Sequence, residues 1–238
     1  MNIQARELGF RQLNQQIQAA AGDVRIDGCI GQRFIGTGLS GQTLTIHGIP
    51  GNALGAYLNG ATIHVCGNVQ DAVGDTMNEG CIVVDGDAGD ALGYAMCGGS
   101  IFVKGNAGYR TGIHMKEYKQ KKPVIVIGGK VGSFLGEYLA GGLIVVLGLG
   151  SDEVPVGNFT GTGMHGGSIF ICTDKEPAGL PEQVTAAVAT AKDLEEIAPW
   201  VEKFAQHFGQ DASELMKKRF WLLRPNAKNP YHQLYTPN

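Results

Sequence analysis

Short apolar runs recur along the chain at a fixed interval, and each run ends at a glycine. Four of these glycines follow one another in steps of nineteen residues, and two more resume the same phase after a five-residue insertion. The glycines of this first column are Gly48, Gly67, Gly86, Gly105, Gly129 and Gly148. In each run the first and third residues are branched aliphatics and the others vary, as in Ile63-His64-Val65-Cys66. This period-two pattern is typical of a β-strand with one buried face.

A second glycine column lies seven residues after the first, at Gly55, Gly74, Gly93, Gly112 and Gly136. Two apolar columns accompany it, one of them from Leu54 to Leu135 and the other from Leu39 to Met164. A unit of nineteen residues is too short to bury its own apolar face, so the units must stack. Both glycine columns are predicted to mark corners, where φ is positive or the next coil leaves no room for a Cβ atom.

We therefore predict a mainly-β protein, a right-handed parallel β-helix over residues 23–173, with one coil of about 19 residues per repeat. A left-handed β-helix of the hexapeptide type needs a period divisible by six, which nineteen is not. Right-handed crossovers are also the general rule for parallel strands. Residues 1–22 are predicted to form a helical cap, because Phe10, Leu13 and Ile17 fall on one helix face before Gly22.

After Asp174 glycine becomes rare and helix formers dominate, so residues 174–238 are predicted to form a helical tail and an extended arm. One helix is expected from Pro181 to Ala191, and a second beyond Pro199 that ends at Gly209. A third is expected from the capping box at Asp211 through Trp221, followed by the arm from Arg224 onward. The apolar content of this tail predicts that it docks on the far end and side of the β-helix or on a partner.

Two irregular segments are candidate contact surfaces. The insertion between Gly112 and Gly129 must bulge outward, because the repeat resumes in phase after it; its lysines are Lys116, Lys119, Lys121 and Lys122. This loop is either a contact for an acidic partner or a charged loop that water solvates. The glycine-rich segment that holds Met164 and His165 is the second candidate. Because it leads into another strand and not into a helix, a phosphate-binding loop is not indicated.

Composition narrows the class of protein. The chain has 238 residues and 37 glycines, but its 43% hydrophobic content and phased columns indicate a packed domain and not disorder. A net charge of −3 and a pI near 6.1 favour neither nucleic acid nor an anionic membrane as a partner. No apolar stretch approaches eighteen residues and no signal-peptide pattern is present, so a cytoplasmic protein is expected. Five cysteines without CxxC spacing predict neither a disulfide framework nor a zinc site.

The sharpest catalytic suggestion is the outward column of His47, Cys66 and Asp85. A nucleophile, base and orienting group need the histidine in the middle, whereas stacking places the cysteine there. The other histidines, His64 among them, occupy unrelated repeat positions or the tail. We therefore predict no catalytic, cofactor-binding or metal-binding residue. A secreted polysaccharide lyase is disfavoured, because arginine is nearly absent from the repeats and no signal is seen; a plain scaffold is the other alternative.

Several motifs together resemble one known family. They are Gly86-Asp87-Ala88-Gly89, Gly105-Asn106-Ala107-Gly108, Glu137-Tyr138-Leu139-Ala140-Gly141-Gly142, Gly163-Met164-His165-Gly166-Gly167 and the closing pattern from Arg224-Pro225 to Leu234-Tyr235. They resemble the glycine-motif (GXGXG) β-helix domain of the glutamate synthase large subunit, here as a separate polypeptide. The resemblance implies a non-catalytic structural subunit of an oxidoreductase in glutamate biosynthesis and nitrogen metabolism.

The resemblance also implies partners and cofactors. The partners would be a class II glutaminase subunit and an FMN-dependent synthase subunit, with self-association as a further alternative. The synthase subunit would hold FMN and an iron–sulfur cluster, and this chain would bind neither. Two alternatives remain open: the β-helix C subunit of a formylmethanofuran dehydrogenase-like molybdenum or tungsten complex, and a subunit of an N-methylglutamate synthase-like enzyme.

Overall fold

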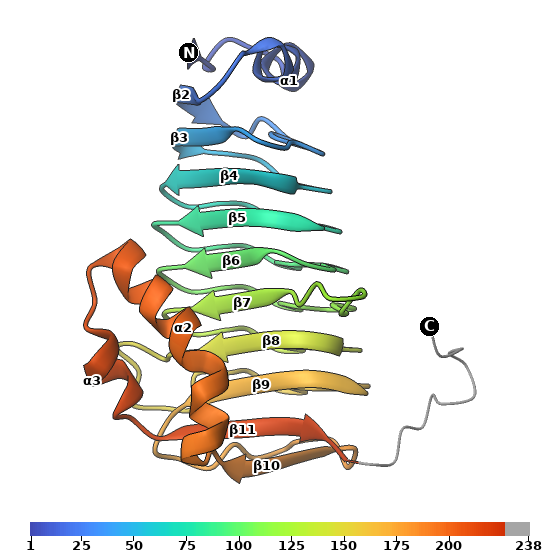
Figure 1. The fold of residues 1–238 in the computed structure, drawn as a ribbon, viewed down its shortest axis with the longest axis vertical. Helices are drawn as coiled ribbons and strands as arrows, with labels where there is room; N and C mark the ends of the chain where they lie inside the picture. The colour runs from blue at the N-terminus through green and yellow to red at the C-terminus, as the bar shows by residue number, and fades with distance from the viewer. Residues whose placement is uncertain (227–238) are drawn as a thin grey trace.

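The computed structural model describes residues 1–226, which form a rod of stacked coils (Figure 1). The rod strands are β2 (Val24–Ile30), β3 (Thr43–Ile49), β4 (Asn59–Cys66), β5 (Glu79–Val84), β6 (Ser100–Val103), β7 (Val124–Ile127), β8 (Ala140–Val146) and β9 (Gly166–Cys172). Each pairs in parallel with the next, and the first residues of successive runs lie opposite one another, as Ile63 and Ile82 do. The predicted parallel β-helix is confirmed.

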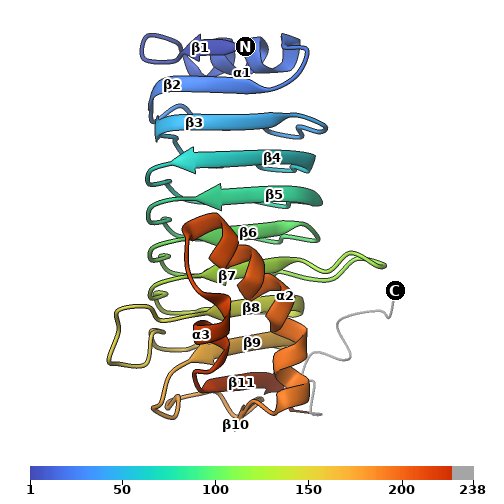
Figure 2. The same ribbon diagram turned by 60° about the vertical axis from the view of Figure 1, so that its left-hand side comes forward.

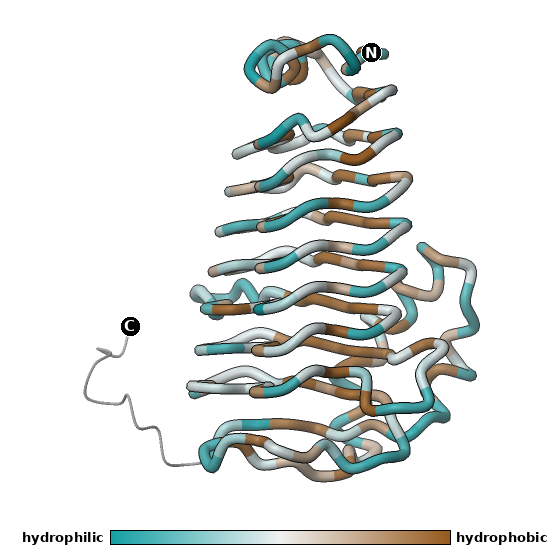
Figure 3. Tube along the Cα trace, turned by 180° about the vertical axis from the view of Figure 1, so that it is seen from behind, coloured by the Kyte–Doolittle hydropathy of each residue, from teal (hydrophilic) through white to brown (hydrophobic). Residues whose placement is uncertain are grey.

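The core of the rod is built from columns of like residues. The first and third residues of each run point inward and are fully buried, and the Leu and Met column from Leu39 to Met164 packs against them. Figure 3 shows these hydrophobic stretches lying above one another from coil to coil. Every coil therefore supplies part of the core of its two neighbours, as a repeat that is too short to fold alone requires.

The second glycine column lies where isoleucine side chains of a neighbouring coil leave no room for a Cβ atom. Gly93 has φ +68°, and a Cβ atom there would come within 2.5 Å of Ile125 Cδ1 on the next coil. The first column behaves differently, since among its members only Gly48 and Gly148 have positive φ. At Gly86 the Cβ position is filled by the side-chain oxygen of Asn68 on the preceding coil. That oxygen accepts a hydrogen bond from the backbone N–H of Asp87 at 2.9 Å.

Two columns of residues other than glycine also have positive φ, between 50° and 65°. They are Phe34, Ala53, Ala72, Ala91, Arg110, Phe134 and Phe159 in the first column, and Tyr57, Thr76, Ala95, His114 and Tyr138 in the second. Hydrogen bonds between coils offset the cost of this backbone conformation, since the N–H of Tyr57 donates to the carbonyl of Asp75 at 2.7 Å. These corners form one edge of the rod.

The N-terminal segment closes one end of the rod. Strand β1 (Asn2–Gln4) pairs in parallel with β2, and helix α1 (Phe10–Ala19) follows it. Leu13 and Ile17 of α1 are buried in the main core. The apolar face that the spacing of these residues predicts therefore covers the open end of the first coil (Figure 1).

The C-terminal segment contains two strands as well as helices. After β10 (Val184–Val188) come α2 (Ala191–Phe208), α3 (Ala212–Met216) and β11 (Phe220–Pro225). The predicted helix from Pro181 to Ala191 is wrong, as is the part of the third helix that was expected to reach Trp221. These segments form strands because of tertiary contacts. β11 pairs antiparallel with β9, and β10 pairs antiparallel with β11, so the two strands cover the last strand edge of the rod. Most of the predicted arm lies outside the described residues.

Helix α2 lies along the outer face of the sheet over its C-terminal half (Figure 2). Its residues Ile197, Val201 and Phe204 are buried in a second apolar cluster, which lies outside the coils. The sheet contributes outward-facing side chains to this cluster: Val83, Phe102, Val126, Val145 and Phe170. An ion pair of 2.6 Å between Lys122 Nζ and Glu196 Oε1 joins α2 to the insertion. The outer face of β2, β3 and β4 remains without a covering helix (Figure 1).

The insertion projects from the rod as a tight turn in which Tyr118 and Lys121 form an antiparallel bridge. Lys121 pairs with Glu79 at 2.9 Å, so two of the four candidate contact lysines are held by carboxylates of this chain.

The expectation that Met164 contributes to an interface is wrong. Its side chain is 1% exposed, because it occupies the last inward position of the Leu and Met column. Among residues 1–226, no helix has both the length and the apolar character needed to cross a membrane.

Candidate functional site

The uncovered part of the outer sheet face carries a ladder of titratable side chains on successive coils. Asp27 lies opposite His47, and His47 lies opposite Cys66. Asp85 follows β5 directly, at the level of Cys66, because Val84 is in register with Val65. The stacking of the repeats therefore places His47, Cys66 and Asp85 in one outward column, with the cysteine in the middle as predicted.

His64 joins this column, which the sequence analysis did not foresee. Its Nε2 atom lies 3.0 Å from both carboxylate oxygens of Asp85. One donor atom each of His64, Cys66 and Asp85 lie within 4.8 Å of one another. His64 does occupy a different repeat position, opposite Thr45 and Val83, but diagonal neighbours on one sheet face are also within reach of long side chains. A comparison of repeat positions finds only the residues that lie directly opposite one another on neighbouring strands.

The cluster does not have the arrangement of a catalytic triad. Burial raises the pKa of the Cys66 thiol, and the nearby charge of Asp85 raises it further. The thiol is therefore protonated near neutral pH and is a weak nucleophile. His64 is directed at Asp85 and not at the sulfur, so it is not placed to remove the thiol proton.

Two further imidazoles border the cluster. The Nε2 atom of His47 is fully enclosed and has no hydrogen-bond partner among residues 1–226. His207, near the end of α2, lies against Phe102 with ring centroids 5.0 Å apart. Burial lowers the pKa of His207, and the charge of His64 lowers it further, so α2 ends close to this cluster. The site is thus rich in groups that bind a proton or a metal ion.

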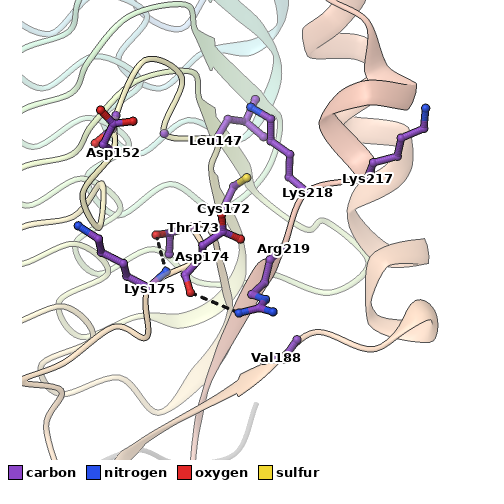
Figure 4. A pocket seen from close by; sticks show the side chains of 12 residues that line it. Leu147, Asp152, Cys172, Thr173, Asp174, Lys175, Val188, Lys217, Lys218 and Arg219 are labelled. Atoms are coloured by element: carbon purple, nitrogen blue, oxygen red, sulfur yellow. Dashed lines mark hydrogen bonds between the residues drawn. The ribbon is translucent and has the colours of Figure 1, made fainter.

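A second candidate is a cavity of about 780 Å³ at the C-terminal end of the rod. Its cationic lining residues are Lys175, Lys217, Lys218 and Arg219, and its acidic ones are Asp152 and Asp174. Figure 4 shows Cys172 at the centre of this group. Arg219 is held by a hydrogen bond from its Nη1 atom to the backbone oxygen of Asp174 at 3.4 Å, and Lys175 forms an ion pair with Glu153 at 2.7 Å.

The thiol of Cys172 is expected to resist alkylation, because burial raises its pKa from 9.0 to about 11. This shift lowers the thiolate fraction at pH 8 by about a hundredfold, and the alkylation rate should rise with pH until the pH passes that pKa. The measurement is iodoacetamide labelling of the native protein from pH 7 to pH 10, with mass spectrometry of each cysteine. Labelling of Cys172 at pH 8 as fast as that of a free thiol would contradict this expectation.

The remaining predicted contact residues are Lys116, Lys119 and His165. Lys119 lies over the ring of Tyr118, with its Nζ atom 5.2 Å from the ring centroid. Lys116 is exposed and has no ion pair among the described residues. The Nδ1 atom of His165 lies 3.0 Å from the carbonyl oxygen of Gly163, at the corner of the last coil.

One surface feature was missed entirely in the sequence. Exposed and half-buried aromatic side chains gather at the corners with positive φ, and we name them the aromatic edge: Tyr57, His114, Phe134, Tyr138 and Phe159, whose own φ is positive, and Tyr94 and Tyr109, which directly precede residues with positive φ. His114 stacks on Tyr138 with centroids 5.1 Å apart, and Phe134 stacks on Phe159 at 5.0 Å. The guanidinium of Arg110 lies 5.1 Å from the centroid of Phe134. Aromatic residues that recur in a repeat phase outside the apolar columns were the available signal.

The fold and these surfaces define a glycine-rich parallel β-helix with a side helix packed on its sheet. A model of the GXGXG motif family matches residues 12–226, and the chain belongs to that family. The predicted resemblance to the glycine-motif domain is thereby confirmed.

Two similar proteins place the chain among its relatives. It is 43% identical over 253 aligned positions to "Uncharacterized protein MJ1350" of Methanocaldococcus jannaschii, an alignment that covers 99% of this chain and 96% of that protein. Its fold is similar to a chain of the formyltransferase/hydrolase complex FhcABCD from Methylorubrum extorquens, solved in complex with methylofuran. That similarity has a TM-score of 0.65 at 23% identity and covers 84% of this chain and 72% of the other.

Proposed function

We propose that this chain is a non-catalytic structural subunit that holds catalytic subunits of an oxidoreductase-type complex along its rod. The observation that carries the proposal is the aromatic edge. Tyr57 and Phe159 are each 55% exposed, although burial of an aromatic side chain is strongly favourable. Protein interfaces are enriched in aromatic residues and arginine, and Arg110 lies among the rings of this edge.

The rigidity of the edge supports the same role. Each corner is fixed by hydrogen bonds to the coils on both sides, since Gly55 donates to the carbonyl of Ile35 while Tyr57 donates to that of Asp75. A surface fixed in this way loses little conformational entropy when a partner binds. It can also hold two partners at a constant separation along the rod.

Within this role we place the chain first in a glutamate synthase-type complex. The support is its membership of the GXGXG family together with the motifs that resemble the β-helix domain of glutamate synthase. The partners would be a class II glutaminase subunit and an FMN-dependent synthase subunit that also holds an iron–sulfur cluster. This chain would bind neither cofactor and would act in the cytoplasm.

A second candidate is a complex of the formyltransferase/hydrolase kind. The observation in its favour is the fold similarity to a chain of FhcABCD, at a TM-score of 0.65. In that complex the chain would again be a structural subunit, and the same edge would face different catalytic partners.

Co-expression tests the proposal and separates the two candidates. The tagged chain should co-purify with a glutaminase and an FMN synthase subunit encoded in the same genome, and the set should form glutamate from glutamine and 2-oxoglutarate. Omission of this chain should abolish that coupled activity. Co-purification with formyltransferase and hydrolase subunits instead would select the second candidate. Association with neither set, or turnover by the isolated chain, would overturn the proposal.

A surface variant tests whether the aromatic edge is the contact. Replacing Tyr109 and Phe159 together by serine should reduce co-purification by at least about tenfold, because exposed aromatic anchors at interfaces commonly contribute more than 1 kcal/mol each. Glu202→Ala, on the exposed face of α2, is the matched control and should leave association unchanged. Equal recovery of partners by both variants would show that partners bind elsewhere.

A further inference from the structure

Three side chains bring different metal-ligating groups to one point of the sheet surface, and we propose that they bind one zinc ion. They are His64 and Cys66 of β4 and Asp85 at the end of β5. One donor atom from each lies within 4.8 Å of the others. This proposal revises the expectation, drawn from the absence of CxxC spacing and from the unrelated repeat positions of the histidines, that the chain has no metal site. It does not depend on the proposed function.

The separation of the donor atoms is close to what tetrahedral zinc requires. Bonds of about 2.0 Å to nitrogen and oxygen and about 2.3 Å to sulfur place the donors about 3.3 to 3.5 Å apart. The side chains of His64 and Asp85 are 41% and 36% exposed, so they can turn by the small amount that is needed. The backbone beneath them is fixed, because Ile63 pairs with Ile82 and Val65 with Val84. Sites on strands hold their ligands more precisely than sites on loops.

The chemistry of the three groups selects a borderline-soft divalent ion. Cys66 would bind as the thiolate and release its proton to solvent, Asp85 would bind as the carboxylate, and His64 would donate the lone pair of its neutral ring. The two negative charges then balance the charge of Zn²⁺. A thiolate and an imidazole disfavour Mg²⁺ and Ca²⁺, which prefer oxygen ligands.

A second imidazole stands next to the three ligands. His47 lies opposite Cys66 on β3, and its Nε2 atom is enclosed without a hydrogen-bond partner among residues 1–226. Three protein ligands leave the fourth position of a tetrahedral zinc ion open. Since the side chains of His64 and Asp85 are partly exposed and α2 does not extend over β4 (Figure 2), that position is accessible to water or to a donor from another protein. The ion would tie two coils together at the uncovered face.

Cobalt replaces zinc as the probe, because a Co²⁺–thiolate bond gives a charge-transfer absorption band. The full chain, stripped of metal and kept reduced, should take up one equivalent of Co²⁺ and develop this band, and Zn²⁺ should displace it. Cys66→Ser should abolish the band, and Asp85→Asn should weaken Zn²⁺ affinity by more than about tenfold in competition with a chelating dye. Cys97→Ser and His114→Gln are matched controls and should bind as the unchanged chain does.

Two outcomes would overturn the proposal. The first is absence of the thiolate band in the unchanged chain, and the second is a band that survives in Cys66→Ser or disappears equally in Cys97→Ser. Circular dichroism of each variant shows whether it is folded. Since Asn has the size of Asp, Asp85→Asn keeps the test decisive if the cysteine variant fails to fold.

Discussion

Replacing Gly93 by valine is expected to destabilise the protein by about 4 kcal/mol. The strain has two sources, because the backbone at Gly93 has φ +68° and a Cβ atom would meet Ile125 Cδ1 at 2.5 Å. For a domain of this size each kcal/mol shifts the melting temperature by roughly 2 to 4 °C. A fall of about 10 °C or more in thermal denaturation is therefore expected, against less than about 2 °C for the exposed change Lys104→Ala.

Gly38 provides a control that separates the two sources of strain. Its φ is +67°, close to that of Gly93, but no atom lies within 4 Å of the position of its Cβ. Gly38→Val therefore carries only the cost of the backbone conformation, about 1 to 3 kcal/mol. The difference between the two valine variants measures the crowding between coils. Equal melting temperatures for Gly93→Val and Lys104→Ala would show that the glycine column does not mark a close approach.

The rod itself could be predicted from the sequence because stacking makes neighbours of residues one repeat apart. The registers of Ile63 with Ile82 and of Ile82 with Ile101 follow from the nineteen-residue spacing alone. Inward positions must then be apolar in every coil, and the sequence shows this as apolar residues that recur without a break at the same repeat position. The stacking of apolar residues that stabilises a solenoid therefore also makes its core predictable from the sequence.

The position of α2 also left a signal that was overlooked. The second residue of each run faces outward, and along the chain it changes from polar Thr45 and His64 to apolar Val83 and Phe102. The later runs keep it apolar, with Val126, Val145 and Phe170. An outward position that becomes apolar implies a covering element over that part of the sheet only. The second apolar cluster, beneath α2, is that covered part.

The strands β10 and β11 and the contact of His64 with Asp85 could not be predicted in the same way. Residues Val184–Val188 and Phe220–Pro225 become strands because β9 offers an open edge, which is a tertiary cause that overrides a weak local preference for helix. The contact between His64 and Asp85 joins different repeat positions, so a column analysis passes over it. Both features depend on contacts between different repeat positions or with the tail, which the nineteen-residue spacing does not reveal.

Deleting residues 175–238 is expected to make the protein aggregate. The deletion removes β11, which pairs with β9 through Trp221 opposite Ile171, and so exposes a full strand edge. It also removes α2 and uncovers Phe102 and Phe170 on the outer face. An exposed edge beside an apolar surface is a template for pairing between molecules. Size-exclusion chromatography and light scattering of the truncated chain measure the outcome.

The variant Phe204→Ala distinguishes the contribution of α2, on the side of the rod, from that of β11, at its end. Phe204 is fully buried between α2 and the sheet, so its truncation should cost about 3 to 5 kcal/mol. Because β11 still covers β9 in this variant, it should melt earlier but elute as the unchanged protein does. A truncated chain that stays soluble and keeps its melting temperature would show that the tail is not what closes the rod. Aggregation of Phe204→Ala to the same extent as the truncated chain would assign the protection to α2, and not to the pairing of β11 with β9.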